Sequence, residues 1–390
     1  MTSSTSSSTR SRRATAPFVA AVALALLTAG CTGGTSTPSP GGSPSGSPAV
    51  STPVDAASAP ALRELAGDRV AFGVAVAGGG HAGMDLPEPL VSDPAYATLV
   101  STHFSSLTPE NQLKWEYVRP DEKTFAFEGT DAIVDFAEEH GQVVRGHTLL
   151  WHSQNPAWLE QGDRSAAELR ELLRAHVTTV VGRYAGRIAQ WDVANEIFDE
   201  HGELRTTENL WLRELGVDVV ADVFRWAHEA DPEAVLFLND YDAERIGPKS
   251  DAYLALATDL LAKDVPLGGF GVQGHLDTEY PFPDDLAANL QRFADLGLAV
   301  AVTEADVRVP VDSSGVATEA DLAQQSEYFT KLLTACLDVT ACTSFTVWGL
   351  TDAHSWVPFF FDGKGAATLL DEEWAPKPSF LSLSEVLTAG

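Results

Sequence analysis

The sequence predicts an α/β protein that folds as a single (β/α)8, or TIM, barrel. Eight apolar, strand-like runs alternate with amphipathic helical stretches between residues 70 and 349. Repeated strand–helix units over roughly 250 residues have the size and order of this barrel. Polar and aromatic residues follow the ends of these runs, where such barrels carry their sites. The predicted strands are 70–77, 103–108, 143–151, 188–196, 234–240, 269–274, 298–304 and 344–349.

Two of the predicted helices have clear patterns. In residues 166–184, apolar side chains recur at helical spacing, and Ser165 with Glu168 forms a capping box at the start. His176 lies on the apolar face of this helix, so we interpret it as a core histidine. A second helix is predicted from about Ala320 to Cys336, with apolar residues along one side. Both helices stand between predicted strands, as the alternating fold requires.

Composition and charge limit the classes of function. The chain has 390 residues, of which 44% are hydrophobic and 21% charged, as in a globular protein with a sizeable core. Lys and Arg number 25 against 55 Asp and Glu, which gives a net charge of −30. Such a field repels nucleic acids and anionic membranes and favours solubility. We therefore expect no nucleic-acid partner and a neutral or weakly charged substrate.

The first 31 residues are predicted to be a signal peptide. Three arginines precede an apolar segment, residues 17–27, that is too short for an ordinary spanning helix. The segment ends in Leu-Thr-Ala-Gly-Cys (residues 27–31), which resembles a bacterial lipobox with Thr28 where Leu is usual. This predicts lipid attachment at Cys31, with that anchor as the link to a membrane. The alternative is ordinary cleavage near Ala29, which releases a secreted protein.

Residues 32–60 are predicted to be a disordered linker. From Thr32 to Pro48 every residue is Gly, Ser, Thr or Pro, a composition that cannot bury a core and behaves as a flexible tether. The barrel domain is expected to span residues 61–390, with no second linker and no appended binding module. The protein is therefore predicted to be exported, either as a cell-surface lipoprotein or as a secreted protein.

The cysteines agree with export. If Cys31 carries a lipid, Cys336 and Cys342 remain as an even pair, and in an exported protein they are expected to form a disulfide. A bridge over so short a loop would add roughly 2 kcal/mol of stability through loop entropy. Two free, buried thiols are the alternative.

Two glutamates stand where an acid needs an explanation. Glu196 closes the apolar run 188–196, and Glu304 closes the run 298–304. Parallel strands that are covered on both faces need nearly continuous apolar runs. Two carboxylates at the C-terminal ends of two strands are what glycoside hydrolysis requires. The structural alternative is a pair of salt-bridged acids at a sheet edge.

Other predicted strand ends carry groups that suit a carbohydrate. Amide, imidazole and carboxylate groups stand beside tryptophans there. Sugars present alternating hydroxyls and flat C–H faces, to which amphipathic aromatic rings are complementary. The motifs are Glu-Asn-Gln-Leu-Lys-Trp (residues 110–115), Gly-His-Thr-Leu-Leu-Trp-His (146–152), Asn-Asp-Tyr-Asp (239–242), Gly-Val-Gln-Gly-His (271–275) and Trp-Gly-Leu-Thr-Asp (348–352).

With these motifs in this order, the chain resembles glycoside hydrolase family 10, the endo-β-1,4-xylanases, from about residue 61 to residue 378. Trp-Asp-Val-Ala-Asn-Glu at 191–196 is similar to the family's Trp-Asp-Val-Val-Asn-Glu, and Val-Thr-Glu-Ala-Asp follows at 302–306. The resemblance implies an endo-acting, retaining hydrolase of the internal β-1,4-xylosidic bonds of xylan or xylo-oligosaccharides. It implies neither a metal nor a cofactor, and we expect a monomer.

The resemblance also implies roles for individual residues. Glu196 would be the general acid/base and Glu304 the nucleophile. Asn195 would bind the 2-hydroxyl of the sugar at the cleavage site, and His275 would orient Glu304. The next sugar towards the non-reducing end would be bound by Glu110, Asn111 and Lys114. The same cleft would be lined by His147, Trp151, Tyr241, Gln273, Trp348 and Trp356.

The chemistry of a retaining pair sets further requirements. The two carboxyl groups should lie roughly 5 Å apart. Because acids this close repel each other, Glu196 is expected to hold its proton while Glu304 stays ionised. Glu196 would protonate the departing oxygen as Glu304 attacks the anomeric carbon. Once Glu304 is esterified its charge is lost, the pKa of Glu196 falls, and Glu196 can activate water.

Several positions depart from the family pattern. Ala194, Leu113 and Ala305 stand where Val, Met and Leu are usual, and we expect the first two changes to be tolerated. Ala305 is expected to loosen the packing beside the nucleophile. Residues 276–283 do not follow the pattern, so binding on the leaving-group side is not predicted.

Three other interpretations were weighed. His147 and His152 could suggest a metal pair, but an odd spacing on a strand sends them to opposite faces, so no metal is expected and His152 is interpreted as structural. Within enzymes, the alternative is a β-1,4-glucanase or an aryl-glycosidase-like relative. Outside enzymes, it is a catalytically silent surface lipoprotein that binds xylan, against which the presence of both acids argues.

Overall fold

The computed structural model describes residues 55–81 and 84–389, and the structural statements below concern these residues. The predicted signal peptide, Cys31 and most of the predicted linker lie outside them. The described chain begins with a short 3-10 helix, η1 (Ala56–Ser58), ahead of the expected domain start at residue 61. Ala56 is buried, and its carbonyl oxygen lies 3.0 Å from Nε2 of His103. The packed domain thus includes the last residues of the predicted linker.

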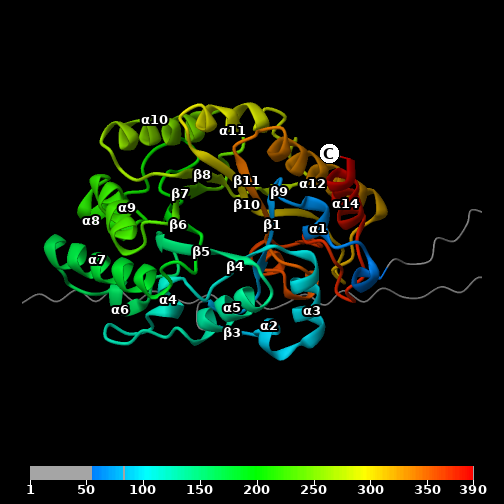
Figure 1. Ribbon diagram of the computed structural model, residues 1–390, viewed down its shortest axis with the longest axis horizontal. Coiled ribbons are helices and arrows are strands. Elements are labelled where there is room, and N and C mark those ends of the chain that lie inside the picture. The colour runs from blue at the N-terminus through cyan, green and yellow to red at the C-terminus, as the bar shows by residue number, and fades with distance from the viewer. Residues whose placement is uncertain (1–54, 82–83, 390) are drawn as a thin grey trace, which may run out of the picture. The chain divides into compact units, whose positions relative to one another are not determined.

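Eight parallel strands form a closed barrel, which confirms the predicted fold class (Figure 1). Neighbours in the barrel are neighbours in chain order, and the last strand closes the ring by pairing with the first. Every predicted run contributes one strand. The strands are β1 (Ala71–Val76), β4 (Ser106–Pro109), β5 (Val143–Leu150), β6 (Gln190–Asn195), β7 (Val235–Asp240), β8 (Gly269–Val272), β10 (Ala299–Pro310) and β11 (Cys342–Val347).

Shorter strands extend the barrel at the end where the parallel strands finish. β2 (Gly79–His81) and β3 (Met84–Leu86) form an antiparallel hairpin after β1. β10 continues past the predicted end at Glu304 because β9 (His275–Asp277) and β12 (Lys364–Gly365) pair with its outer half. In the β9–β10 ladder, His275 lies opposite Asp306, and Asp277 lies opposite Arg308. These short strands were not predicted.

Helices connect the strands and surround the barrel (Figure 1). The two helices predicted in detail are confirmed as α7 (Ala166–Arg183) and α12 (Glu319–Leu337), and the capping box of Ser165 and Glu168 is present. None of the helices in the described ranges is long and apolar enough to cross a bilayer. The others are η2 (Asp352–His354), α1 (Leu62–Ala66), α2 (Pro89–Ser92), α3 (Pro94–His103), α4 (Trp115–Val118), α5 (Glu128–Glu139), α6 (Ala157–Glu160), α8 (Leu210–Leu215), α9 (Asp218–Ala230), α10 (Pro248–Ala262), α11 (Leu286–Ala294), α13 (Val357–Phe360) and α14 (Pro378–Ala389).

The core confirms the interpretation of His176 and explains one glycine. His176 is fully buried, and its ring stacks on Trp115 with 3.5 Å between centroids. Burial lowers the pKa of His176 well below its usual value, so the ring is a neutral core group. On β5, a Cβ at Gly146 would lie 2.3 Å from the indole of Trp191. Glycine therefore lets β5 lie against Trp191 and brings the next residue, His147, to the barrel axis.

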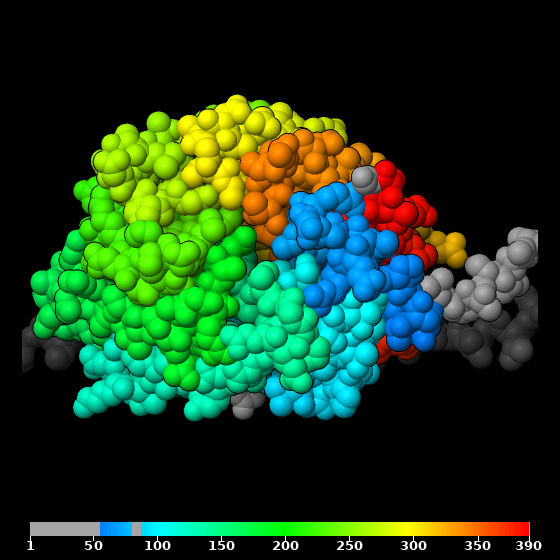
Figure 2. Space-filling view, in the orientation of Figure 1, coloured from blue at the N-terminus to red at the C-terminus, as the bar shows by residue number. Residues whose placement is uncertain are grey.

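Covalent and polar contacts tie the end of the chain to the barrel. Cys336 at the end of α12 and Cys342 at the start of β11 form the predicted disulfide, which excludes the alternative of two free thiols. The guanidinium of Arg69, just after α1, donates to the carbonyl of Leu387 in α14. Figures 1 and 2 show α1 beside α14, so the first and last helices of the domain pack together.

Candidate active site

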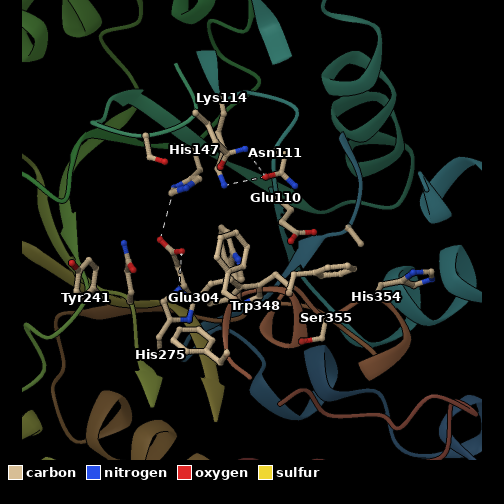
Figure 3. A pocket seen from close by; sticks show the side chains of 18 of the residues that line it. Glu110, Asn111, Lys114, His147, Tyr241, His275, Glu304, Trp348, His354 and Ser355 are labelled. Atoms are coloured by element: carbon tan, nitrogen blue, oxygen red, sulfur yellow. Dashed lines mark hydrogen bonds and ion pairs between the residues drawn. The ribbon is translucent and has the colours of Figure 1, made fainter. Parts of the chain in front are cut away.

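A cavity of about 740 Å³ opens at the C-terminal ends of the barrel strands, where this fold carries its sites (Figure 3). Each barrel strand or the residues just after it contribute to its lining. In strand order these are Ala77, Glu110, His147, Glu196, Tyr241, Gln273, Glu304 and Trp348. All the predicted site residues line this cavity except Asn195, which is fully buried directly beside it.

Glu196 follows β6 and is turned into the cavity by an unusual backbone. Its φ is +53°, a conformation that a non-glycine residue adopts only when its surroundings enforce it. Its Oε1 accepts hydrogen bonds from Gln273 Nε2 at 2.9 Å and from Asn195 Nδ2 at 3.2 Å. Its Oε2 lies 3.8 Å from Nδ1 of His152. Two amide donors and a nearby imidazole, at the ends of three different strands, therefore surround one buried carboxylate.

The protonation of Glu196 differs from the prediction. Burial raises the pKa of Glu196. The charge of His152 and the hydrogen bond from Gln273 lower it by more than burial raises it, so the pKa lies below its usual value. In the free site these cationic and donor groups outweigh repulsion between the two acids. Burial also lowers the pKa of His152. Above that pKa the ring is neutral, and the depression of the pKa of Glu196 is then smaller.

The expectation that His147 and His152 point to opposite faces was wrong. β5 ends at Leu150, and its pairing with β6 shifts register after His147, so strand alternation does not extend to residue 152. Both histidines consequently line the same cavity. An odd spacing separates side chains onto opposite faces only where a regular strand runs through both residues, which is not the case here.

Glu304 lies at the centre of a dense hydrogen-bonding shell. It is 4% exposed, its Oε1 accepts from Asn239 Nδ2 at 2.8 Å, and its Oε2 lies 3.3 Å from Nε2 of His275. Nδ1 of His147 lies 3.8 Å from Oε1. Figure 3 shows His147 and His275 on opposite sides of Glu304. The predicted contact between His275 and Glu304 is present.

His275 is a partly buried cation between two carboxylates. Its Nδ1 lies 2.9 Å from Oδ2 of Asp306, which also accepts from Trp356 Nε1 at 2.8 Å. Burial lowers the pKa of His275, but Asp306 and Glu304 raise it to about 10. At neutral pH the ring therefore carries a proton on each nitrogen and donates towards both acids.

This cation should make stability depend on pH. Because the pKa of His275 rises from its usual 6.5 to about 10 on folding, its contribution is complete below pH 6.5 and is lost as the pH rises through about 10. His275→Gln lacks that contribution. The difference in the free energy of unfolding between wild type and His275→Gln, from urea titrations, should narrow across this range. A difference that stays constant would contradict a charged His275.

A chain of amides links the two glutamates. Asn239, at the end of β7, donates through Nδ2 to Asn195 Oδ1 at 2.9 Å as well as to Glu304. Asn195 in turn donates to Glu196. Thr303 Oγ1 donates to Asn239 Oδ1 at 2.7 Å and fixes the orientation of that amide. The carboxylates of β6 and β10 are thus held in one network that spans three strands.

A second buried network fixes His147. Asp192 on β6 accepts from Arg145 Nε at 3.1 Å and lies 3.0 Å from His147 Nδ1. Burial raises the pKa of Asp192, but the charge of Arg145 and the bond with His147 lower it below its usual value. One ligand atom each of His147, Asp192 and Glu304 lies within 4.8 Å of the others, a spacing that could suit a metal ion. Both oxygens of Asp192 already contact Arg145 or His147, so we interpret the group as a hydrogen-bond network.

The residues after β4 form the predicted polar wall of the cavity. Lys114 Nζ donates to Asn111 Oδ1 at 3.1 Å and lies 4.9 Å from the centroid of the Trp151 ring. Burial raises the pKa of Glu110 to about 7, although Lys114 opposes the rise. Gln154, which was not predicted, also donates to Asn111. These groups present charged and amide donors beside an indole face.

Sequence reasoning missed residues that act through others. Arg145, Asp192 and Asn239 were given no role, although Asp192 and Asn239 belong to strand-end motifs that were singled out. Two exposed phenylalanines of α13, Phe359 and Phe360, also line the cavity. The sequence signal that could have identified them is the run of three consecutive phenylalanines, residues 359–361. Apolar side chains that stay exposed often mark a binding surface.

Comparisons with known proteins agree with this geometry. The model of glycosyl hydrolase family 10 matches residues 62–386. Endo-1,4-beta-xylanase B of Thermotoga neapolitana is 38% identical over 75% of this chain and 83% of its own. An endo-1,4-beta-xylanase of Agaricus bisporus is 36% identical over 78% of this chain and 90% of its own.

Solved structures give the same result. The chain matches native xylanase 10B from Thermotoga maritima with a TM-score of 0.78 and 38% identity, over 84% of this chain and 98% of the other. Xylanase 10B from Thermotoga petrophila RKU-1, solved in complex with xylobiose, matches with the same TM-score of 0.78 and 38% identity, over 84% of this chain and 97% of the other. The barrel, the two strand-end glutamates and these matches confirm the resemblance: the chain belongs to glycosyl hydrolase family 10.

Proposed function

We propose that this protein is an endo-acting, retaining 1,4-β-xylanase in which Glu196 is the general acid/base and Glu304 the nucleophile. The observation that carries the proposal is the pair of buried carboxylates from β6 and β10 that face one cavity and are joined through Asn195 and Asn239. The xylanase relatives, and the xylobiose bound to one of them, support xylan as the substrate. Because the proposed site comes from one chain, a monomer suffices.

The reaction proceeds in two displacements. In the first, an oxygen of Glu304 forms a bond to the anomeric carbon while the glycosidic C–O bond breaks, and Glu196 transfers its proton to the departing oxygen. In the second, Glu196 takes a proton from water as the water oxygen attacks the same carbon and expels Glu304. Two inversions at one carbon retain its configuration.

Charge in the cavity changes in step with these roles. His275 carries a proton at neutral pH and presents it towards the carboxylate of Glu304 that attacks. When Glu304 becomes an ester, its negative charge disappears and the pKa of Glu196 falls. A carboxylate that has just lost its proton to the leaving group is thereby retained as a base. The positive charges around Glu196 assist this second role more than the first.

The cleft suits a pentose polymer. Glu110, Asn111 and Lys114 bind the sugar on the non-reducing side, and Asn195 binds the 2-hydroxyl at the cleavage site. Trp348 and Trp356 lie close to His275, with 6.2 Å and 5.1 Å between ring centroids. Xylose lacks the hydroxymethyl group of glucose, so these indoles admit xylose and exclude glucose by their bulk.

Rates on two polymers test the substrate. The expected result is rapid release of reducing ends from xylan, with carboxymethylcellulose slower by at least about 100-fold, since excluding one substituent by sterics is worth a few kcal/mol. Proton NMR of the first product should show the β-anomer before mutarotation. Faster hydrolysis of carboxymethylcellulose, or an α-anomer as first product, would contradict the assignment.

We also propose that the protein is exported and attached to a membrane through a lipid on Cys31, with the predicted linker up to residue 54 as the tether. The basic, apolar and lipobox-like stretches of the first 31 residues support this. The disulfide of the barrel fits an oxidising compartment. Cys31→Ser, expressed in a bacterium that processes lipoproteins, should shift the enzyme from the membrane fraction to the soluble fraction. Wild-type protein found entirely in the medium would favour ordinary cleavage near Ala29.

A further inference from the structure

A buried lysine at the start of α10 has no role in the reaction described above. Lys249 is 2% exposed, and its Nζ lies 2.9 Å from Oδ1 of Asp240 and 3.7 Å from the centroid of the Tyr241 ring. It lines a second cavity of about 560 Å³, which shares Asp242 and His275 with the active-site cavity. Lys249 therefore lies where the cleft continues beyond Tyr241.

This part of the cleft faces the leaving group. In Figure 3, Tyr241 and Glu110 lie on opposite sides of Glu304. Glu110 belongs to the proposed binding site for sugars on the non-reducing side, so Tyr241 lies beside the sugar that departs. The nearby segment 276–283 was the part of the chain for which no binding role could be predicted.

The ammonium of Lys249 contacts one face of the Tyr241 ring. A buried ammonium at this distance from an aromatic centroid is attracted to the ring face. The phenol is fixed as well: Tyr241 donates to Glu200 Oε1 at 2.9 Å and accepts from the guanidinium of Arg205. With both its face and its hydroxyl held, the ring is a rigid platform for the apolar face of a sugar.

Lys249 is also connected to the backbone of the acid/base. The Oδ2 of its partner Asp240 accepts from the hydroxyl of Tyr253 at 2.6 Å, and that hydroxyl accepts from the backbone N–H of Ile197 at 3.0 Å. Ile197 directly follows Glu196, whose φ of +53° needs enforcement. The chain of contacts thus runs from the ammonium to the peptide that aims Glu196.

The ion pair is costly to bury. Asp240 is fully buried, and burial raises the pKa of Asp240 to about 7 even with Lys249 beside it. Buried ion pairs contribute little net stability, because desolvation offsets their attraction. A contribution to stability therefore does not explain the pair of Lys249 and Asp240, and a role in function does.

We infer that Lys249 is a positioning residue for cleavage, which holds Tyr241 against the leaving-group sugar and Glu196 within reach of the departing oxygen. The inference rests on the proposed function. The inference concerns the leaving-group side of the cleft, where residues 276–283 do not follow the family pattern. Lys249 is one of several titratable groups that interact with Glu196; the others include Lys114, His152, Arg205, Asp240, Tyr241 and Tyr253.

Two substrates separate positioning from folding. Xylopentaose places a sugar on Tyr241 and has a leaving group that needs a proton, whereas 2,4-dinitrophenyl β-xylobioside has neither property. For Lys249→Met, kcat/KM on xylopentaose should fall about 10- to 100-fold, as expected for a displaced catalytic group, with less than about a threefold change on the aryl substrate. The alkaline limb of the pH profile of kcat/KM should move to higher pH, because a positive charge near Glu196 is lost. Lys249→Arg should restore most of the activity.

A double variant and a matched pair complete the test. Lys249→Met with Asp240→Asn removes both charges, so the effect can be measured even if the single variant unfolds. Lys377, which is buried, forms a 2.7 Å ion pair with Asp352, and Lys377→Met with Asp352→Asn should leave the ratio between the two substrates unchanged. Equal losses on both substrates, with an unmoved alkaline limb, would overturn the inference alone. A wild-type enzyme that leaves xylopentaose intact would overturn the proposed function with it.

Discussion

Glu304→Ala is expected to abolish xylan hydrolysis, with kcat reduced by roughly four to six orders of magnitude, the range found when a covalent nucleophile is removed. The variant lacks the oxygen that forms the bond to the anomeric carbon. Its fold should persist, because the neighbours of Glu304 retain other partners: His275 keeps Asp306, and Asn239 keeps Asn195. Steady-state rates, circular dichroism and binding of xylotriose by calorimetry measure these outcomes.

Azide provides the decisive control for this variant. It should enter the space left by the carboxylate, restore turnover of an activated aryl xylobioside and yield an azide product of inverted configuration. Glu385→Ala, an exposed acid on α14, serves as the matched substitution and should retain wild-type rates. Residual xylanase activity of Glu304→Ala above about one per cent would contradict the assignment of the nucleophile.

Glu196→Ala should have an effect that depends on the leaving group. Loss of a general acid costs about 100- to 10,000-fold where the departing oxygen needs a proton, as in xylan. For 2,4-dinitrophenyl β-xylobioside, kcat/KM should change little, while kcat falls because no base activates water for the second displacement. A burst of dinitrophenol followed by a slow phase is the expected signature.

Azide again discriminates, but in the opposite stereochemical sense. With Glu196→Ala it should attack the glycosyl-enzyme and give a product of retained configuration. Glu203→Ala, an exposed acid in the same loop after β6, is the matched control. Equal losses on xylan and on the aryl substrate would show that Glu196 is not the proton donor.

The fold could be predicted from the sequence because each barrel strand is buried on both faces. Such strands appear as short apolar runs. The run that forms β11 (Cys342–Val347), which closes the barrel, could be recognised as readily as the run that forms β1. β9 and β12 were missed because they are two or three residues long and gain their order from β10. Their formation depends on a partner that is distant in the chain, which no local pattern reveals.

The glutamates could be predicted, but their environment could not. Glu196 and Glu304 interrupt apolar runs, whereas Asn239, Asp192 and Lys249 act through neighbours that only the closed barrel supplies. The lowered pKa of Glu196 in the free site could not be predicted for the same reason. Its sign depends on His152 and Gln273, which come from other strands and contact the carboxylate directly.

In the outer half of β10, every second side chain contributes to the active site or to its support. The side chains at every second position, Glu304, Asp306 and Arg308, point to the same side of the strand. Across the ladder with β9, Asp306 contacts His275 and Arg308 contacts Asp277. Inserting one residue after Glu304 would send Asp306 and Arg308 to the opposite side and strip His275 of its second acid. Inserting two would return Asp306 to the same side but would displace it along the strand from its place opposite His275. Insertions in this part of β10 should therefore reduce activity, and a single added residue most of all.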